Sequence, residues 1–222
     1  MSFVRRARPM EMTTDRRKET VDLEPATRVL TWIVTGVSDD QLGAPTPCRD
    51  ATVGDLLAHV DGLSLAFAAA ARKEQLAGGV GGATADASRL GDDWRVRIPR
   101  RLAALAAAWR DDGAWAGMTQ AGGLDLPGEV AGVVALDEVI VHGWDIAVSS
   151  GQPFTCAPEH LHAAYGFVQS TVAQHPRGSP GLFGPPVSVP DDASPLDRLI
   201  GLTGRDPSWP AGLSATEPNQ QR

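Results

Sequence analysis

The chain has 222 residues, 42% hydrophobic and 21% charged, which are the proportions of an ordinary globular protein with its own core. A formal net charge of −7 leaves no basic face to displace counterions from phosphates, so we exclude a nucleic-acid partner. Two cysteines are too few for a disulfide scaffold, and neither an export signal nor an uncharged apolar run of membrane-spanning length is present, so we expect a cytoplasmic protein with no membrane partner.

The first two predicted helices follow a charged, aperiodic lead over residues 1–20, which we expect to be disordered. Apolar residues recur at spacings of three and four over residues 23–37, which indicates an amphipathic helix. After a loop that contains prolines, Thr52 and Asp55 form an acidic version of the capping box. They open a second helix that ends near Glu74.

Two more helices are predicted in the middle of the chain. The third begins at Pro99 or shortly before it and ends near Asp112. Residues 115–126 are expected to be irregular or briefly extended. Pro127 fits the first position of a fourth helix, because its missing N–H costs nothing there, and Gly151 ends that helix.

The C-terminal part begins with a fifth helix at Pro158. We predict a helical bundle over 21–176 and a C-terminal extension over 177–222 that packs on the bundle and has a disordered end. Within the extension, Phe183 and its neighbours predict a short strand or an extended arm, and Ser194 caps a last short helix. The sequence therefore predicts an all-α fold built on a bundle.

A candidate metal site lies on the fourth helix and on the second. Glu138, His142 and Asp145 share one stripe of the fourth helix, because successive residues are rotated by about 100°. Burying such groups unpaired costs several kcal/mol, which a divalent cation would offset. His59, within an apolar run of the second helix, supplies another ligand. Two imidazoles and a carboxylate suit Zn²⁺ and leave one position open, although iron, nickel and manganese accept the same donors.

Each of these residues also has a simpler interpretation. Alone, His59 would more often be a hydrogen-bonded core histidine, and Glu138 with His142 an ordinary i,i+4 pair. We assign Asp145 to orienting an imidazole, with direct ligation as an alternative. Cys48 is interpreted as a buried loop cysteine rather than a thiolate of the site. Arg205 is expected to pin a turn rather than to bind substrate.

Several separated segments resemble one family. Residues 46–48 (Thr-Pro-Cys), 55–60 (Asp-Leu-Leu-Ala-His-Val) and 138–147 (Glu-Val-Ile-Val-His-Gly-Trp-Asp-Ile-Ala) are similar to the DinB-like metal-binding proteins related to mycothiol-dependent maleylpyruvate isomerase. Residues 183–190 and 204–209 resemble the tail of the metal-binding subgroup, whose C-terminal tail is short. The combination of the segments, in this order, carries the resemblance.

The resemblance implies a DinB-like four-helix bundle with an extra short C-terminal arm and helix. It implies a divalent metal, most often zinc, on the residues that match His59, Glu138 and His142, and in the isomerase a low-molecular-weight thiol adds to the substrate. This chain departs from the family by having Ala51 where Trp is frequent and Val148 where Arg is frequent, and its tail is shorter than the isomerase's C-terminal domain. Metal binding therefore carries over better than the isomerase reaction.

Two functions follow as hypotheses. The first is a metal-dependent thiol (mycothiol-type) transferase or isomerase, whose partners are a small-molecule thiol and an electrophile. The alternative is a non-catalytic metal-binding or sensing bundle, in which the ion joins the second and fourth helices and stabilises the fold. An open coordination position beside a pocket favours the first, and a filled one favours the second. A homodimer is left open.

Overall fold

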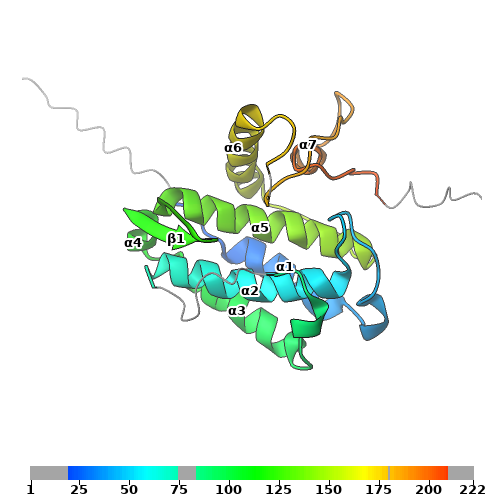
Figure 1. The fold of residues 1–222 in the computed structure, drawn as a ribbon, viewed down its shortest axis with the longest axis horizontal. Coiled ribbons are helices and arrows are strands. Elements are labelled where there is room, and N and C mark those ends of the chain that lie inside the picture. The colour runs from blue at the N-terminus through cyan, green and yellow to red at the C-terminus, as the bar shows by residue number, and fades with distance from the viewer. Residues whose placement is uncertain (1–19, 75–83, 180, 210–222) are drawn as a thin grey trace, which may run out of the picture.

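Four helices pack side by side in the computed structural model, which describes residues 20–74, 84–179 and 181–209 (Figure 1). Helices α1 and α2 each contact both α3 and α5, so the four helices close into a bundle. The predicted helical bundle is confirmed, whereas the lead and the chain end that we expected to be disordered lie almost entirely outside the described residues. The bundle helices are α1 (Glu24–Gly36), α2 (Val53–Ala71), α3 (Trp94–Ala108) and α5 (Gly128–Ser149).

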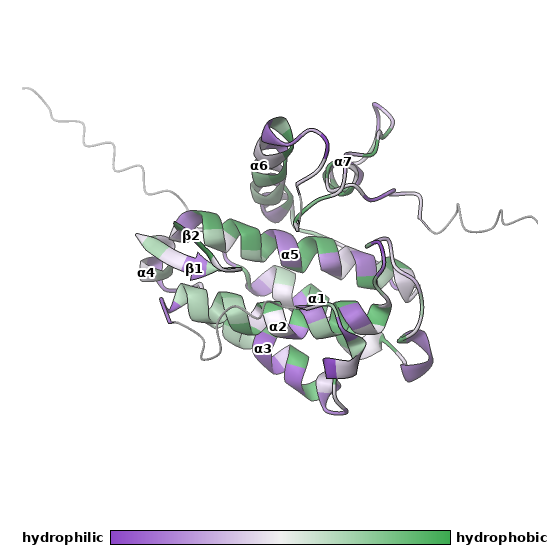
Figure 2. Cartoon of the chain, in the orientation of Figure 1, coloured by the Kyte–Doolittle hydropathy of each residue, from purple (hydrophilic) through white to green (hydrophobic). Residues whose placement is uncertain are grey.

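The two central helices are buried over most of their length. The hydrophobic colouring along α5 in Figure 2 agrees with its burial against α1, α2 and α6. By length and composition alone, α2 could cross a membrane, but 67% of its most apolar window is buried inside the described part of the molecule. Such burial is expected of a helix that is apolar on most faces and lies at the centre of a bundle.

Local signals in the sequence account for the helix starts. In α2 the predicted capping box is confirmed, because the Asp55 N–H donates to the Thr52 hydroxyl and the Thr52 N–H donates to the Asp55 carboxylate at 2.9 Å. Helix α3 begins earlier than Pro99, because Trp94 and Ile98 are both buried and extend its apolar face by one turn. Pro99 then lies inside the helix, where its ring removes one backbone hydrogen bond.

A small hairpin makes the fold mostly rather than wholly helical. Strands β1 (Met118–Ala121) and β2 (Leu124–Pro127) pair antiparallel across Gly122 and Gly123, which both have positive φ. Two consecutive positive φ angles are typical of a tight hairpin turn that glycine accepts without strain. The short helix α4 (Asp112–Trp115) precedes the hairpin, and two 3-10 turns lie elsewhere, η1 (Asp39–Gln41) and η2 (Ala87–Arg89).

The remaining helices, α6 (Pro158–Gln174) and α7 (Pro195–Leu202), lie on the side of the bundle where α5 runs (Figure 1). Between α6 and α7, residues 181–194 form an extended arm, and no β-strand is formed within these residues. The Val187 N–H donates to the Gly201 carbonyl at 2.8 Å and fixes the arm to α7. The sequence predicted either a short strand or an extended arm here, and the extended arm is the one that forms.

We predict that Gly128→Ala destabilises the protein by about 1–3 kcal/mol, because a methyl group there has no room. A Cβ at Gly128 would overlap the Ala114 carbonyl oxygen and lie 2.9 Å from the Trp115 carbonyl carbon, and backbone atoms cannot move aside cheaply. Gly166→Ala is the matched control, because a Cβ there meets nothing within 4 Å and alanine favours the helix by up to about 1 kcal/mol. Urea unfolding measures the free energy of unfolding of both variants. Equal values for Gly128→Ala and Gly166→Ala would contradict the prediction.

Candidate metal centre

The structure brings the three predicted ligands together from two helices. Glu138 and His142 lie one turn apart on α5, and His59 faces them from α2. Glu138 Oε2 lies 3.3 Å from His59 Nε2 and 3.1 Å from His142 Nε2. One donor atom from each of the three lies within 4.8 Å of the other two, which makes the three residues a candidate site for one metal ion.

The donor set fits a divalent cation. Ligand atoms about 2.1 Å from a tetrahedral Zn²⁺ lie roughly 3.4 Å apart, close to the two separations between Glu138 and the imidazoles. The two imidazole rings meet nearly edge to face, with centroids 4.8 Å apart, and the Nε2 atom of each lies within 3.3 Å of the same carboxylate oxygen. Two nitrogens and one oxygen suit zinc, and other first-row ions accept the same donors.

The protonation states of the metal-free cluster follow from its burial and its internal contacts. Burial acts to raise the pKa of Glu138, but hydrogen bonds from His142 and His59 outweigh burial and hold this pKa well below its ordinary value. Burial acts to lower the pKa of His142, but hydrogen bonds to Asp145 and Glu138 raise it to about 9. Without a cation, the cluster is therefore a carboxylate beside an imidazolium.

Asp145 lies behind His142 and is completely buried. Its Oδ2 is 3.1 Å from His142 Nδ1, the nitrogen directed away from Glu138. This contact fixes the orientation of the ring, as the sequence-based assignment of Asp145 supposes. Burial acts to raise the pKa of Asp145, but the charge of Arg205 and the hydrogen bond with His142 hold it below its ordinary value.

Arg205 has a larger role than the sequence suggested. Its Nε donates to Asp145 Oδ1 at 3.0 Å and its Nη2 donates to Asp145 Oδ2 at 2.9 Å. It also donates to the Thr203 carbonyl, so it does pin the turn after α7, but its main partner is a carboxylate 60 residues away. No helical spacing links positions 145 and 205, and periodicity therefore gave no signal for this pair.

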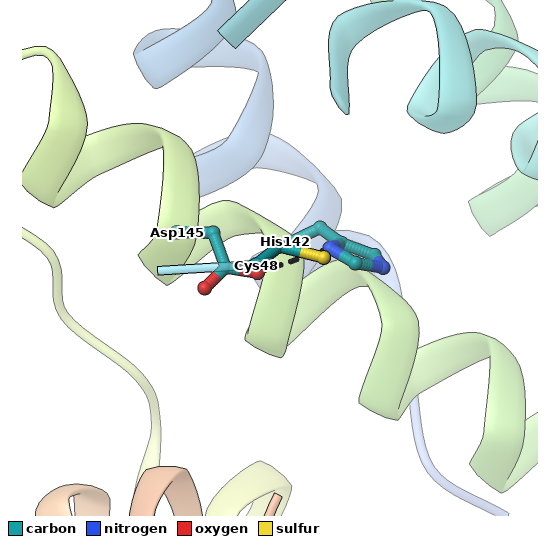
Figure 3. A group of neighbouring side chains, drawn as sticks. All are labelled: Cys48, His142 and Asp145. Carbon is teal, nitrogen blue, oxygen red and sulfur yellow. Dashed lines mark hydrogen bonds and ion pairs between the residues drawn. The ribbon is translucent and has the colours of Figure 1, made fainter. Parts of the chain in front are cut away.

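Cys48 lies at the edge of the site, on the loop that precedes α2. Its sulfur belongs to a second group of candidate ligand atoms, with His142 and Asp145, and Figure 3 shows the sulfur beside the imidazole ring. Burial raises the pKa of the Cys48 thiol, although the nearby Arg205 acts in the opposite direction. Cys48 lies on a loop, as expected, but it is only partly buried rather than buried, and it lines the pocket beside the candidate ligands.

A pocket of about 430 Å³ opens onto these residues. The loop before α2 forms one side of it, the arm and the turn after α7 form the other, and the candidate ligands line its interior. His59 and Glu138 keep about one fifth of their side-chain surface exposed. A small molecule can therefore reach the cluster. The charged and potential ligand residues along the pocket are Cys48, Arg49, His59, Glu138, His142 and Arg205.

A bundle with a His–Glu–His cluster at the base of a pocket has the architecture of a DinB-like metal-binding protein. Residues 23–147 match the model of the mycothiol maleylpyruvate isomerase N-terminal domain, and the chain belongs to this family. The resemblance noted in the sequence is thereby confirmed. The match ends within α5, so α6, α7 and Arg205 lie beyond it.

Two relatives are proteins of Mycobacterium tuberculosis: uncharacterized protein MT0763 of strain CDC 1551 / Oshkosh and uncharacterized protein Rv0738 of strain ATCC 25618 / H37Rv. Each is 30% identical to this chain over 177 residues, which cover 78% of this chain and 90% of the relative. No solved structure matches the chain. The comparisons thus give the family and no specific activity.

We predict that Arg205→Met destabilises the protein by about 3–5 kcal/mol, because it leaves the buried Asp145 carboxylate without its main counter-charge. The double variant Asp145→Asn/Arg205→Met should recover most of that loss, since neither residue is then charged. Urea unfolding of the single and double variants at neutral pH measures both values. A loss below about 1 kcal/mol for Arg205→Met would show that the pair contributes only as much as a surface ion pair.

Proposed function

We propose that His59, Glu138 and His142 hold one divalent cation, with zinc as the ion that the donor set favours, and that the protein is a metal-dependent thiol (mycothiol-type) transferase or isomerase. The observation that carries the proposal is the convergence of three donor atoms within 4.8 Å inside a pocket of about 430 Å³. Structural metal sites are closed, whereas catalytic sites keep a position open toward a pocket.

The residues around the cluster have separate tasks in this proposal. Bound there, the cation would supply Lewis acidity and lower the pKa of a thiol or water that reaches it. Asp145 holds the His142 ring so that Nε2 is directed at the site. The arm and the turn after α7 form one side of the pocket.

The nature of the substrates is proposed from the family and from the size of the pocket. The matching domain is named for an isomerase that uses mycothiol, a low-molecular-weight thiol. A volume of about 430 Å³ lies within the range of small-molecule sites, roughly 300–1,000 Å³. We therefore propose a small thiol as cosubstrate and a small electrophile as its acceptor.

One observation favours the alternative of a non-catalytic metal-binding bundle. The Cys48 sulfur lies close to His142, so a rotation of this side chain toward the cluster would let a thiolate fill the fourth position of a tetrahedral ion. The ion would then cross-link the bundle through α2 and α5 and stabilise it without reacting. The two functions differ in whether the fourth position accepts an external ligand.

We predict one divalent ion per chain in the purified protein. His59→Ala and His142→Ala should lose most of the metal affinity, while Asp145→Asn should lower it about 10- to 100-fold through the orientation of His142. His162→Ala, which changes an exposed histidine of α6, is the control and should bind as the wild type does. Elemental analysis with competitive chelation measures the affinities, and circular dichroism checks that each variant is folded. Unchanged metal content in His59→Ala would contradict the assignment.

We further predict that the metal-loaded protein catalyses conjugation or isomerisation within a panel of small thiols and electrophiles, and that chelation abolishes the reaction. Cys48→Ser separates the two functions. If the thiol of Cys48 fills the fourth position, this variant should bind the metal more weakly, and if the position is open, affinity should change little. The alternative is supported if no reaction occurs across the panel while chelation lowers the melting temperature sharply.

A further inference from the structure

The pocket is lined by more positive than negative side chains. Among its described lining residues, Glu138 is the single acid, and it lies between two imidazoles. Arg49 and Arg205 both line the same pocket. Asp145, which balances Arg205, is completely buried behind it rather than exposed to the pocket. A bound divalent cation would make the balance more positive still, so the charge distribution favours an anionic ligand.

The two arginines differ in how their guanidinium groups are used. Arg205 is buried and is bound to Asp145 and to a backbone carbonyl. Arg49 is exposed at the pocket, and within the described part of the chain no hydrogen bond or ion pair involves its side chain. Arg49 is thus the cation of this pocket whose donors remain available for a ligand.

The loop that carries Arg49 is held in place by its own hydrogen bonds. The single O–H of Thr46 is shared between two carbonyl oxygens, that of Cys48 at 3.0 Å and that of Ala51 at 2.9 Å. The Ala51 N–H donates to the Cys48 carbonyl at 3.2 Å, and a backbone bridge joins Pro45 to Thr52 beside it. These contacts fix the backbone on both sides of Arg49, so its side chain starts from a defined position at the pocket.

We propose that the ligand of this pocket carries a carboxylate and that Arg49 is the residue that recognises it. The inference rests on the proposed function, since the other end of the same ligand meets the metal cluster. A guanidinium presents two parallel N–H groups that match the two oxygens of a carboxylate. Phosphate sites usually add several backbone N–H groups at a helix N-terminus. Here the group proposed to bind the ligand is a single guanidinium, that of Arg49, because Arg205 is already bound to Asp145.

The test compares two thiols that differ in a single charge, 3-mercaptopropionate and its neutral amide, 3-mercaptopropanamide. Binding to the cobalt-substituted protein is followed by the absorption of the cobalt–thiolate bond. We expect the wild type to bind the acid about 10-fold more tightly than the amide, the size of one charge-assisted hydrogen bond. Arg49→Gln should lose this preference without a change in the affinity for the amide, and Arg49→Lys should keep part of it.

Arg100→Gln is the matched control, because Arg100 is an exposed arginine of α3 that does not line the pocket and has no side-chain partner among the described residues. It removes the same charge from the protein and should keep the full preference. If Arg49→Gln also keeps the preference, or if the wild type shows none, the inference is wrong.

A second measurement needs no metal and separates the two proposals. In the metal-free protein, the NMR signal of the Arg49 Nε–H group should shift on addition of propionate and not of propionamide. A response to propionate without any cobalt–thiolate absorption would overturn the proposed function and keep the role of Arg49. Thiolate absorption with equal affinities for the acid and the amide would overturn the role of Arg49 and keep the proposed function. No response in either measurement would overturn both.

Discussion

The carboxylate of Glu138, held between imidazoles from two helices, is the contact on which the rest of the site depends. It lies between bundle helices with about one fifth of its side-chain surface exposed, where an uncompensated charge would be costly. Compensation comes from His59 across the bundle and from His142 one turn along α5. The His142 imidazole also contacts Asp145, and Asp145 in turn contacts Arg205. Alternating charges thus run from the pocket to the turn after α7, and they tie the C-terminal region to the bundle.

These contacts show that the site depends on residues outside the four-helix bundle as well as on the bundle itself. The family match covers the bundle up to residue 147 and includes the three candidate ligands. The side of the pocket formed by the arm and the turn after α7, and the counter-charge of Asp145, come from residues beyond that match.

The sequence predicted the parts of the structure that local rules determine. Periodicity gave the bundle helices, and the capping box at Thr52 gave the start of α2. Helical spacing also placed Glu138 and His142 on one stripe of α5. In the structure, Glu138 Oε2 lies 3.1 Å from His142 Nε2. The hairpin was expected only as an irregular or briefly extended stretch, although the pair Gly122-Gly123 is a recognisable turn signal.

Long-range contacts were harder to predict. Whether His59 faces α5 depends on how α2 and α5 pack against each other. The sequence suggested this contact through the family resemblance and the types of ligand, not through residue spacing. The pairing of Arg205 with Asp145 was missed, because nothing in an isolated segment shows which buried carboxylate an arginine 60 residues away will meet. The approach of Cys48 to His142 depends in the same way on tertiary packing.

The most direct test of this account is a crystal structure of the protein grown with one equivalent of Zn²⁺, with diffraction data collected on both sides of the zinc absorption edge. The account predicts one anomalous peak per chain, about 2.0–2.2 Å from His59 Nε2, His142 Nε2 and a carboxylate oxygen of Glu138, with its remaining position toward the pocket. A map with no peak between α2 and α5, or with its peak on other residues, would contradict it.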